Sequence, residues 1–395
     1  MSALVLLLLA AAPGLPPDVG LAQALGLLET QSPRTAADRA EVDLAAADHI
    51  GAGAWPNPTF SYGGQQLAQG TNTGSSMQHQ FAVEQPLLLF GQRGARVEAA
   101  ALNVTAEKAR IAATLAERRL AVRQAFAALV ARQEQQRLVS ESLAELEKAG
   151  GVVKARAAAG DRSAYDVARV EAETLSLKVD GMNATADVSD AAGKLSVVLG
   201  FPNWRPRATG TLEPEGIGTD AAQLWDTAVK QRPSLQWARD REAAARASLI
   251  AARRDRLPVP AISIGAVVTR DAESVAAMWG LSMPLPIFDR NQGPIAHASA
   301  AVQVNALRGE AETAEARAEL DRTLAVYVER RAAVASLERM PALRQRAEDA
   351  YREGRSSILE LLDALRSLKE LRLLQLQQRE SAKKAEAELM AAAGL

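Results

Sequence analysis

The sequence contains no cysteine and few aromatic residues. Without cysteine, the chain can form neither a disulfide bond nor a thiolate-ligated metal site. Aromatic residues make up only 4% of the 395 residues and alanine dominates the apolar fraction, so closely packed helices are favoured over a core of bulky side chains. The formal net charge of -1 gives no electrostatic reason to expect nucleic acid as a partner.

Long apolar runs are also missing, since none approaches the roughly 20 residues that a transmembrane helix requires. The most apolar stretch, Ala3–Ala12, is too short to span a bilayer and is typical of the apolar region of a secretory signal. We therefore expect residues 1–20 to form a signal peptide, with a buried N-terminal helix as the alternative, because no Lys or Arg precedes the apolar stretch. If the protein enters a membrane, it must enter as strands.

Residues that could carry enzyme chemistry are scarce. His49, His79 and His297 are far apart in the sequence, so they provide no metal-ligand spacing. Residues 91–94 and 216–218 include glycines but lack the lysine and the full glycine pattern of a phosphate-binding loop. No nucleophile elbow is present. The sequence therefore predicts no catalytic residue, no metal site, no cofactor and no enzyme activity.

Several landmarks occur twice, in the same order and about 200 residues apart, which indicates a duplicated unit. The paired segments are 31–33 with 231–233, 56–62 with 258–264, 85–91 with 283–289, and 159–163 with 353–357. We therefore expect an internal two-fold repeat. The first repeat would comprise residues 21–200 and the second residues 221–395, joined by a linker or equatorial segment at 201–220.

Each repeat contains one predicted strand hairpin, at about residues 59–86 and about residues 261–284. Apolar and polar residues alternate along each strand, as at His79, Phe81 and Val83, over roughly 8–10 residues, the length of a tilted membrane strand. Four strands cannot close a membrane barrel, and open edges are not tolerated in lipid. Either three copies share a twelve-stranded barrel, or the hairpins are a soluble decoration.

Long helices account for most of the chain, so the predicted fold is mainly α with a small β part. Residues 92–159 lack proline and would form a helix of roughly 100 Å, with Gly150-Gly151 as a weak spot. Residues 163–199 carry apolar or small residues at alternating spacings of three and four, the pattern of a coiled-coil seam. Turns are predicted at 160–163 and 354–357, where glycine ends one helix and serine caps the next. The alternative is a cytosolic coiled coil.

Three segments at the junctions between helices and strands form a recognisable set: Gln85-Pro86-Leu87, Gly91–Arg96 and above all Pro284–Gly293. In these segments the chain resembles the TolC-type outer membrane efflux proteins, and Pro284–Gly293 is most similar to the branch that serves cobalt–zinc–cadmium exporters. The resemblance implies a homotrimer, with long α-helical hairpins that form a tunnel in the periplasm and a twelve-stranded barrel in outer membrane lipid. It also implies two protein partners, a periplasmic adaptor (membrane fusion) protein and a proton-driven inner-membrane pump of the resistance-nodulation-division type.

The resemblance further implies a gate at the periplasmic tip of the tunnel. The positions of this chain that match the gate are Asp166, Tyr351, Arg355, Glu360 and Asp363. The tip turns that would dock with the adaptor consist of Gly160, Asp161, Arg162, Ser163, Gly354, Ser356 and Ser357. Symmetry copies of Asp166, Glu360 and Asp363 could form acidic rings that attract cations. Otherwise these carboxylates are ordinary solvated helix positions.

Together these inferences favour the outer membrane channel of a tripartite efflux system that exports heavy-metal cations. The same channel could instead serve drugs, organic compounds or type I protein secretion, because selectivity would reside mainly in the pump. A third hypothesis is a soluble periplasmic coiled-coil protein of adaptor or structural class, which would neither need detergent nor conduct ions.

Overall fold

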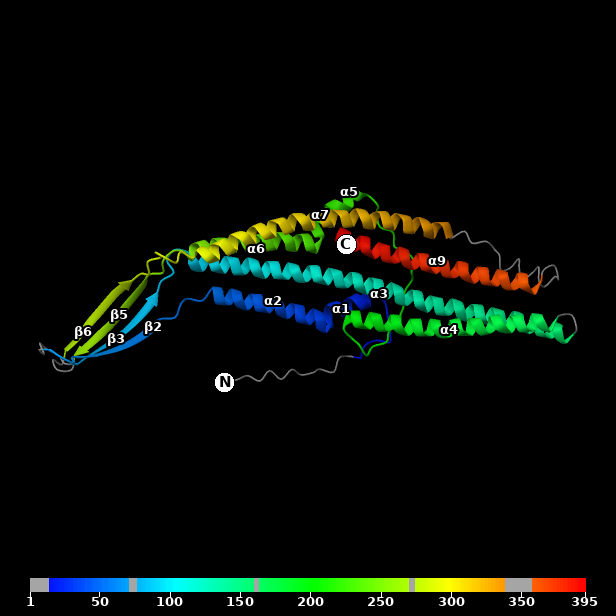
Figure 1. Ribbon diagram of the computed structural model, residues 1–395, viewed down its shortest axis with the longest axis horizontal. Helices are drawn as coiled ribbons and strands as arrows, with labels where there is room; N and C mark the ends of the chain where they lie inside the picture. The colour runs from blue at the N-terminus through cyan, green and yellow to red at the C-terminus, as the bar shows by residue number, and fades with distance from the viewer. Residues whose placement is uncertain (1–13, 71–76, 160–162, 270–273, 338–356) are drawn as a thin grey trace. The chain divides into compact units, whose positions relative to one another are not determined.

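The computed structural model describes residues 14–70, 77–159, 163–269, 274–337 and 357–395. Within these residues the chain consists mostly of long helices, with one four-stranded sheet and a second sheet of two very short strands (Figure 1). The predicted fold class, mainly α with a small β part, is confirmed. None of the described helices combines the length and the apolar character needed to cross a membrane.

The chain divides into two compact units, and each unit draws on both predicted repeats. Unit 1 contains residues 1–37, 114–232 and 316–395, and unit 2 contains residues 38–113 and 233–315. The two compact units are therefore not the two predicted repeats, and the repeat boundaries at residues 200 and 221 stay a prediction.

Unit 2 holds the four-stranded sheet. Its strands are β2 (Thr59–Gln66), β3 (Met77–Pro86), β5 (Ala261–Thr269) and β6 (Ser274–Ser282). They pair antiparallel in the order β2-β3-β5-β6. Alternating apolar and polar residues favour strands here, and the flanking prolines lie at strand ends, where no ladder hydrogen bond is lost. β2 and β6 are edge strands, and no strand in the described part of the chain pairs with their outer sides.

The helices of unit 2 are α6 (Pro233–Arg254), the end of α2 (Pro33–Ala52), and the starts of α3 (Gln92–Ala158) and α7 (Gln292–Leu337). Arg93 Nε donates a hydrogen bond to the Gly53 carbonyl at 2.7 Å, which ties the start of α3 to the end of α2. Asn291 has a left-handed φ of 58°, and its Nδ2 donates to the Ala252 carbonyl of α6 at 2.7 Å. Two segments that carry the family resemblance thus position the first turns of α3 and α7.

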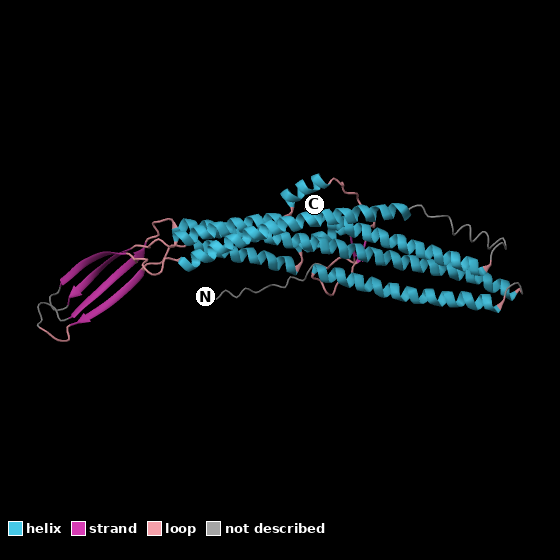
Figure 2. Cartoon of the chain, turned by 45° about the horizontal axis from the view of Figure 1, so that its top comes forward, coloured by secondary structure: helices cyan, strands magenta, loops and turns pink. Residues whose placement is uncertain are grey.

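Unit 1 is built from long helices. It contains α1 (Leu21–Thr30), α4 (Ala164–Leu199), α5 (Ala221–Gln231), α9 (Ile358–Ala393) and the remaining parts of α3 and α7. Within this unit the long helices run side by side (Figures 1 and 2): α3, α4 and α9 share one apolar cluster, and α7 packs against α9. Phe126 of α3 packs with Leu195 of α4, Arg132 of α3 lies 3.4 Å from Glu380 of α9, and Tyr327 of α7 is buried against α9.

The predicted coiled-coil seam of α4 is covered by neighbouring helices. Its buried members are Val170, Leu177, Ala184, Ala191 and Leu195. The weak spot predicted at Gly150-Gly151 is wrong, because α3 continues through both glycines without a break. Gly150 is buried at a close approach of α3 and α4, where an added Cβ would lie 2.9 Å from Val170 Cγ1. The glycine here makes room for a neighbouring helix and does not end its own.

Replacing these two adjacent glycines by alanine is expected to change stability in opposite directions. Gly150→Ala puts a methyl group against the buried Val170, and such overpacking costs about 1–3 kcal/mol. Gly151→Ala meets nothing within 4 Å and gains up to about 1 kcal/mol of helix propensity. Thermal unfolding of the two variants checks both signs. Stabilisation by both would show that α3 and α4 do not approach closely at Gly150.

α4 and α9 occupy corresponding places in the two repeats. Each has 36 residues, begins with a serine N-cap and ends at a glycine with positive φ, 87° at Gly200 and 75° at Gly394. An added Cβ on Gly200 would lie 3.2 Å from Pro33 Cδ, and one on Gly394 would lie 2.8 Å from Arg232 N. Each helix therefore ends against the corner between the first two helices of its own repeat, as a duplicated unit requires.

Some residues within the predicted signal peptide have contacts in unit 1. β1 (Asp18–Val19) pairs in parallel with β4 (Arg207–Ala208) of the linker, and Val19 is fully buried. Trp204 Nε1 donates a hydrogen bond to the Pro16 carbonyl at 2.9 Å. Because cleavage after residue 20 would remove these contacts, we expect any cleavage of the signal to fall before Pro16.

Candidate functional site

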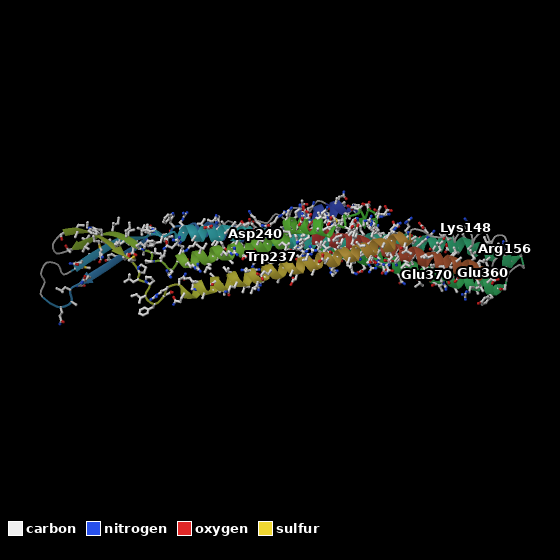
Figure 3. The ribbon with its side chains drawn as sticks, turned by 90° about the horizontal axis from the view of Figure 1, so that it is seen from above. Lys148, Arg156, Trp237, Asp240, Glu360 and Glu370 are labelled. Atoms are coloured by element: carbon white, nitrogen blue, oxygen red, sulfur yellow. The ribbon has the colours of Figure 1, made fainter. Side chains whose placement is uncertain are left out.

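Three helix ends meet at one end of unit 1, which we call the tip: α3 ends there, and α4 and α9 begin there. An apolar cluster joins them, formed by Leu146, Val153, Val170, Leu177, Ile358, Leu361 and Leu362. Figure 3 shows Arg156 of α3 and Glu360 of α9 at this end, with Lys148 and Glu370 further from it. Burial of these aliphatic side chains fixes the three helix ends relative to one another.

Ser163 and Ser357 cap α4 and α9 in the same way. Ser163 Oγ accepts a hydrogen bond from Asp166 N at 3.3 Å, and Ser163 N donates to Asp166 Oδ2 at 3.3 Å. Ser357 Oγ accepts from Glu360 N at 3.2 Å, and Ser357 N donates to Glu360 Oε2 at 3.0 Å. Each pair is a capping box, and the carboxylate also favours the positive end of the helix dipole. Two of the predicted gate carboxylates therefore have a capping role.

Two ion pairs tie α9 to α4 behind the tip. Arg366 Nη2 lies 2.6 Å from Glu173 Oε2, and Lys369 Nζ lies 3.1 Å from Asp180 Oδ2. The hydrogen bond with Glu173 raises the pKa of Arg366 above its ordinary value, so the guanidinium stays charged. The two carboxylates are one heptad apart on α4 and therefore project from one face of the helix.

A separate set of ion pairs joins α3 to α4. Lys154 Nζ lies 2.8 Å from Glu171 Oε1, and Lys178 Nζ lies 3.4 Å from Glu147 Oε1. All four side chains are about half exposed. These pairs lie within the first helical hairpin, whereas the pairs between α4 and α9 link the two repeats. A relative movement of the repeats at the tip would break the second set and leave the first intact.

A buried charged cluster holds the linker onto α9 elsewhere in unit 1. Glu386 is 2% exposed; its Oε1 accepts from Gly216 N at 2.9 Å and its Oε2 from Lys383 Nζ at 2.8 Å. Lys383 Nζ also lies 3.1 Å from Glu215 Oε1. Burial by itself lowers the pKa of Lys383, but the hydrogen bonds and charges of Glu386 and Glu215 outweigh it, and the pKa is raised. The lysine is therefore held in its charged form.

In unit 2 the register of the sheet gathers apolar side chains on one face. Phe60 is opposite Val83, Val83 is opposite Ile264, and Ile264 is opposite Trp279, so one apolar row crosses all four strands. Because side chains alternate along a strand, the other face carries mostly polar and small residues, with Val267 and Met278 as larger apolar exceptions. Ile264 is 67% and Trp279 86% exposed, which leaves this apolar face open to its surroundings.

The described side chains contain no group of three or more His, Cys, Asp or Glu placed to hold a metal ion. His79, on the apolar face of β3, shares a hydrogen bond of 2.9 Å between its Nδ1 and the Tyr62 hydroxyl, and the two rings stack.

The tip of unit 1 combines helix ends, apolar contacts and ion pairs. Such an arrangement can hold helices together or release them.

The family model described as outer membrane efflux protein matches residues 24–201 and 224–395 of the chain. The chain belongs to this family. The resemblance predicted from its proline-flanked junctions is confirmed, and so is its place in the outer membrane; the soluble coiled-coil alternative is wrong.

Two relatives and one solved structure add detail. The nickel-cobalt-cadmium resistance protein NccC of Alcaligenes xylosoxydans xylosoxydans is 28% identical over 328 residues, which cover 79% of this chain and 69% of NccC. The cobalt-zinc-cadmium resistance protein CzcC of Cupriavidus metallidurans is 27% identical over 277 residues, which cover 69% of this chain but less than two thirds, 64%, of CzcC. The crystal structure of CusC, reported with transmembrane channel formation, matches with a TM-score of 0.74 at 20% identity over 95% of this chain and 92% of CusC, which shows the same fold.

Three of the five predicted gate residues of this outer membrane efflux protein lie in the described part of the chain. Asp166, Glu360 and Asp363 lie at the tip, and Asp363 is exposed on α9, one turn before Arg366. The predicted residues outside the described part of the chain are Tyr351, Arg355, Gly160, Asp161, Arg162, Gly354 and Ser356. The sequence reasoning missed the ion pairs between α4 and α9. Opposite charges at helical spacing were visible in the sequence, but nothing there indicates that these two helices are neighbours.

Proposed function

We propose that the protein is the outer membrane channel of a tripartite system that exports heavy-metal cations, together with a periplasmic adaptor and a proton-driven inner-membrane pump. The observation that supports heavy-metal cations as the substrate is the match to NccC and CzcC, whose names specify nickel, cobalt, zinc and cadmium. The channel would act as a conduit, because the pump supplies the energy. It needs no catalytic residue and no cofactor, and it is not an enzyme.

The sheet of unit 2 supports a homotrimer. Strand directions alternate along β2-β3-β5-β6, so β6 of one copy can pair antiparallel with β2 of the next. Three copies would give a closed twelve-stranded sheet with no edge in lipid. The strands have 8, 10, 9 and 9 residues, close to the roughly 9–11 that a tilted membrane strand requires. The apolar row from Phe60 to Trp279 would face the lipid.

The tip would form the gate and the adaptor contact. The turns at 160–163 and 354–357 would meet the adaptor, and symmetry copies of Asp166, Glu360 and Asp363 would surround the pore with carboxylates that attract cations. The ion pairs from Arg366 and Lys369 to α4 would hold the second helical pair against the first while the channel is closed. Opening would require these pairs to break.

Metal export can be tested by deleting the gene. We expect the deletion to lower the concentrations of cobalt, zinc and cadmium salts that stop growth, and to leave tolerance of organic dyes unchanged. The intact chain should restore tolerance. Gly265→Val should not, because a Cβ on Gly265 would lie 2.1 Å from the Phe81 carbonyl oxygen in the middle of the sheet. Loss of dye tolerance with unchanged metal tolerance would favour the drug-export alternative.

The trimer can be tested by light scattering of the protein extracted in detergent from outer membranes. The expected protein mass is about three times 41.9 kDa, less any cleaved signal peptide. A monomer would contradict the shared sheet, since four strands cannot close alone.

A further inference from the structure

An uncovered apolar loop joins the sheet of unit 2 to α7. Along β6 and past its end, every second residue is large, apolar and exposed: Trp279, Leu281, Met283, Leu285 and Ile287. The next residue, Phe288, is 91% exposed, the highest value for a large apolar side chain in the described part of the chain. The apolar row of the sheet therefore continues along the chain beyond the last strand.

The backbone of this loop is held in one shape. Pro284 and Pro286 restrict its φ angles. Ile287 N donates a hydrogen bond to the Leu285 carbonyl at 2.9 Å, and Asp289 Oδ1 accepts one from Asn291 N at 2.9 Å. A loop that is already fixed loses little conformational entropy when its exposed apolar side chains are buried against a partner.

Arginines gather on the helix side of this loop, where α6 ends and where α3 and α7 begin (Figure 1). The segments 87–98, 252–260 and 284–292 contain six arginines and three carboxylates. The hydrogen bond from Asn291 to the Ala252 carbonyl brings Arg290 close to Arg253. These segments therefore form one basic cluster with a net charge of +3 per chain.

Most of the positive charge in this cluster is not compensated by carboxylates. Asp255 lies 2.9 Å from Arg96 and neutralises that arginine. Four further arginines are exposed and form no ion pair with any residue that the structure describes; they are Arg253, Arg254, Arg256 and Arg290. Arg254 and Arg290 donate to backbone carbonyls, those of Phe90 at 3.5 Å and Ile287 at 3.2 Å. An exposed group of like charges of this kind attracts anions.

We propose that Arg253, Arg290 and their neighbouring arginines bind the phosphate of an anionic phospholipid in the periplasmic leaflet of the outer membrane, while the loop at 285–288 inserts among its acyl chains. Apolar strand, apolar loop and arginines follow one another in the same order as acyl chains and phosphate in a lipid. Guanidinium groups bind phosphate oxygens in a bidentate way, and the net positive charge favours an anionic headgroup. The inference rests on the proposed lipid-facing row of the sheet and is independent of the exported substrate.

Native mass spectrometry of the full chain in detergent, titrated with phosphatidylglycerol or with phosphatidylcholine, tests this site. We expect phosphatidylglycerol to bind at the lower concentration, and Arg253→Gln with Arg290→Gln to weaken its binding roughly thirtyfold. The matched control is Arg241→Gln with Arg308→Gln. It removes two exposed arginines of α6 and α7 that lie roughly 18 Å and 24 Å further from the sheet along these helices, and it should bind like the native chain.

Three outcomes would overturn the lipid site. They are undiminished binding by the Arg253→Gln, Arg290→Gln variant, an equal loss in the control variant, and displacement of the lipid by an equal concentration of inorganic phosphate, which would show that the arginines take the free ion.

Two further variants separate the loop from the arginines. Phe288→Ser should weaken both lipids alike, and unchanged binding would show that the loop does not insert. Arg253→Lys with Arg290→Lys keeps the charges and should retain most of the binding, which excludes misfolding as the cause of the loss in the glutamine variant. Metal tolerance is measured separately, so loss of the lipid site leaves metal export standing, and loss of metal export leaves the lipid site standing.

Discussion

Glu386→Ala is expected to lower the free energy of unfolding of unit 1 by about 3–5 kcal/mol, the range for breaking one side of a buried ion pair. The Glu386 carboxylate is 2% exposed and accepts hydrogen bonds from Gly216 N and Lys383 Nζ. Its removal leaves the Lys383 ammonium, on a side chain that is 16% exposed, paired with Glu215, whose side chain is 77% exposed. Urea unfolding of the detergent-solubilised protein, followed by far-ultraviolet circular dichroism, measures the loss.

Two controls show whether burial is the reason. Glu141→Ala removes a carboxylate of similar pairing distance, 3.1 Å from Arg137, but at an exposed site, and should change stability by less than about 1 kcal/mol. The double variant Lys383→Met with Glu386→Leu removes both charges and should recover most of the loss, because apolar pairs often replace buried ion pairs without penalty. Equal effects of Glu386→Ala and Glu141→Ala would contradict the role of the buried cluster.

The same cluster predicts a dependence on alkaline pH. The pKa of Lys383 is raised in the folded protein, so the folded state binds the proton more tightly than the unfolded state. The stability this lysine contributes is therefore fully present below its ordinary pKa of 10.5 and is lost as the pH rises through the higher folded value. In the Lys383→Met variant, this part of the loss of stability at alkaline pH should be absent.

Local pattern was sufficient to predict most of the secondary structure. The strands follow from period-two alternation between prolines, and the covered seam of α4 follows from its three–four spacing. The capping roles of Asp166 and Glu360 were also readable, since each follows a serine by three residues before an apolar helix. The family resemblance assigns both residues to the gate, whereas the local sequence pattern alone indicates the capping role.

The sequence could not reveal contacts that depend on which distant segments are neighbours. β1 and β4 have two residues each, too few for any periodic signal, yet they join residues near 18 to residues near 207. Gly150 looked like a weak point because its local propensity is low; the helix that requires a glycine there lies across the hairpin. The Glu386 cluster likewise joins α9 to the linker, and its members are separated by about 170 residues in the chain.

Removing the ion pairs between α4 and α9, by Arg366→Ala with Lys369→Ala, is expected to raise the ratio of open to closed channels roughly tenfold to ten-thousandfold. Each exposed pair contributes about 0.2–1 kcal/mol, and a trimer would contain about six of them, so together they favour the closed state by roughly 1–6 kcal/mol. A difference of about 1.4 kcal/mol corresponds to a factor of ten. Open probability in planar bilayers measures the shift.

The charge swap Glu173→Arg with Arg366→Glu keeps an ion pair at the same place. The channel of this variant should therefore stay closed if the ion pair itself holds the tip together. Lys178→Ala is the control within one hairpin, because it removes an ion pair between α3 and α4. Its two side chains are 50% and 51% exposed, which is more than Glu173 and Lys369 in the pairs between the repeats. High salt should open the native channel and leave the Arg366→Ala, Lys369→Ala channel unchanged, since screening acts on charges that are still present. If Lys178→Ala opened the channel as far, the gate would depend on the packing of the whole tip, and the two pairs between the repeats would have no special part in it.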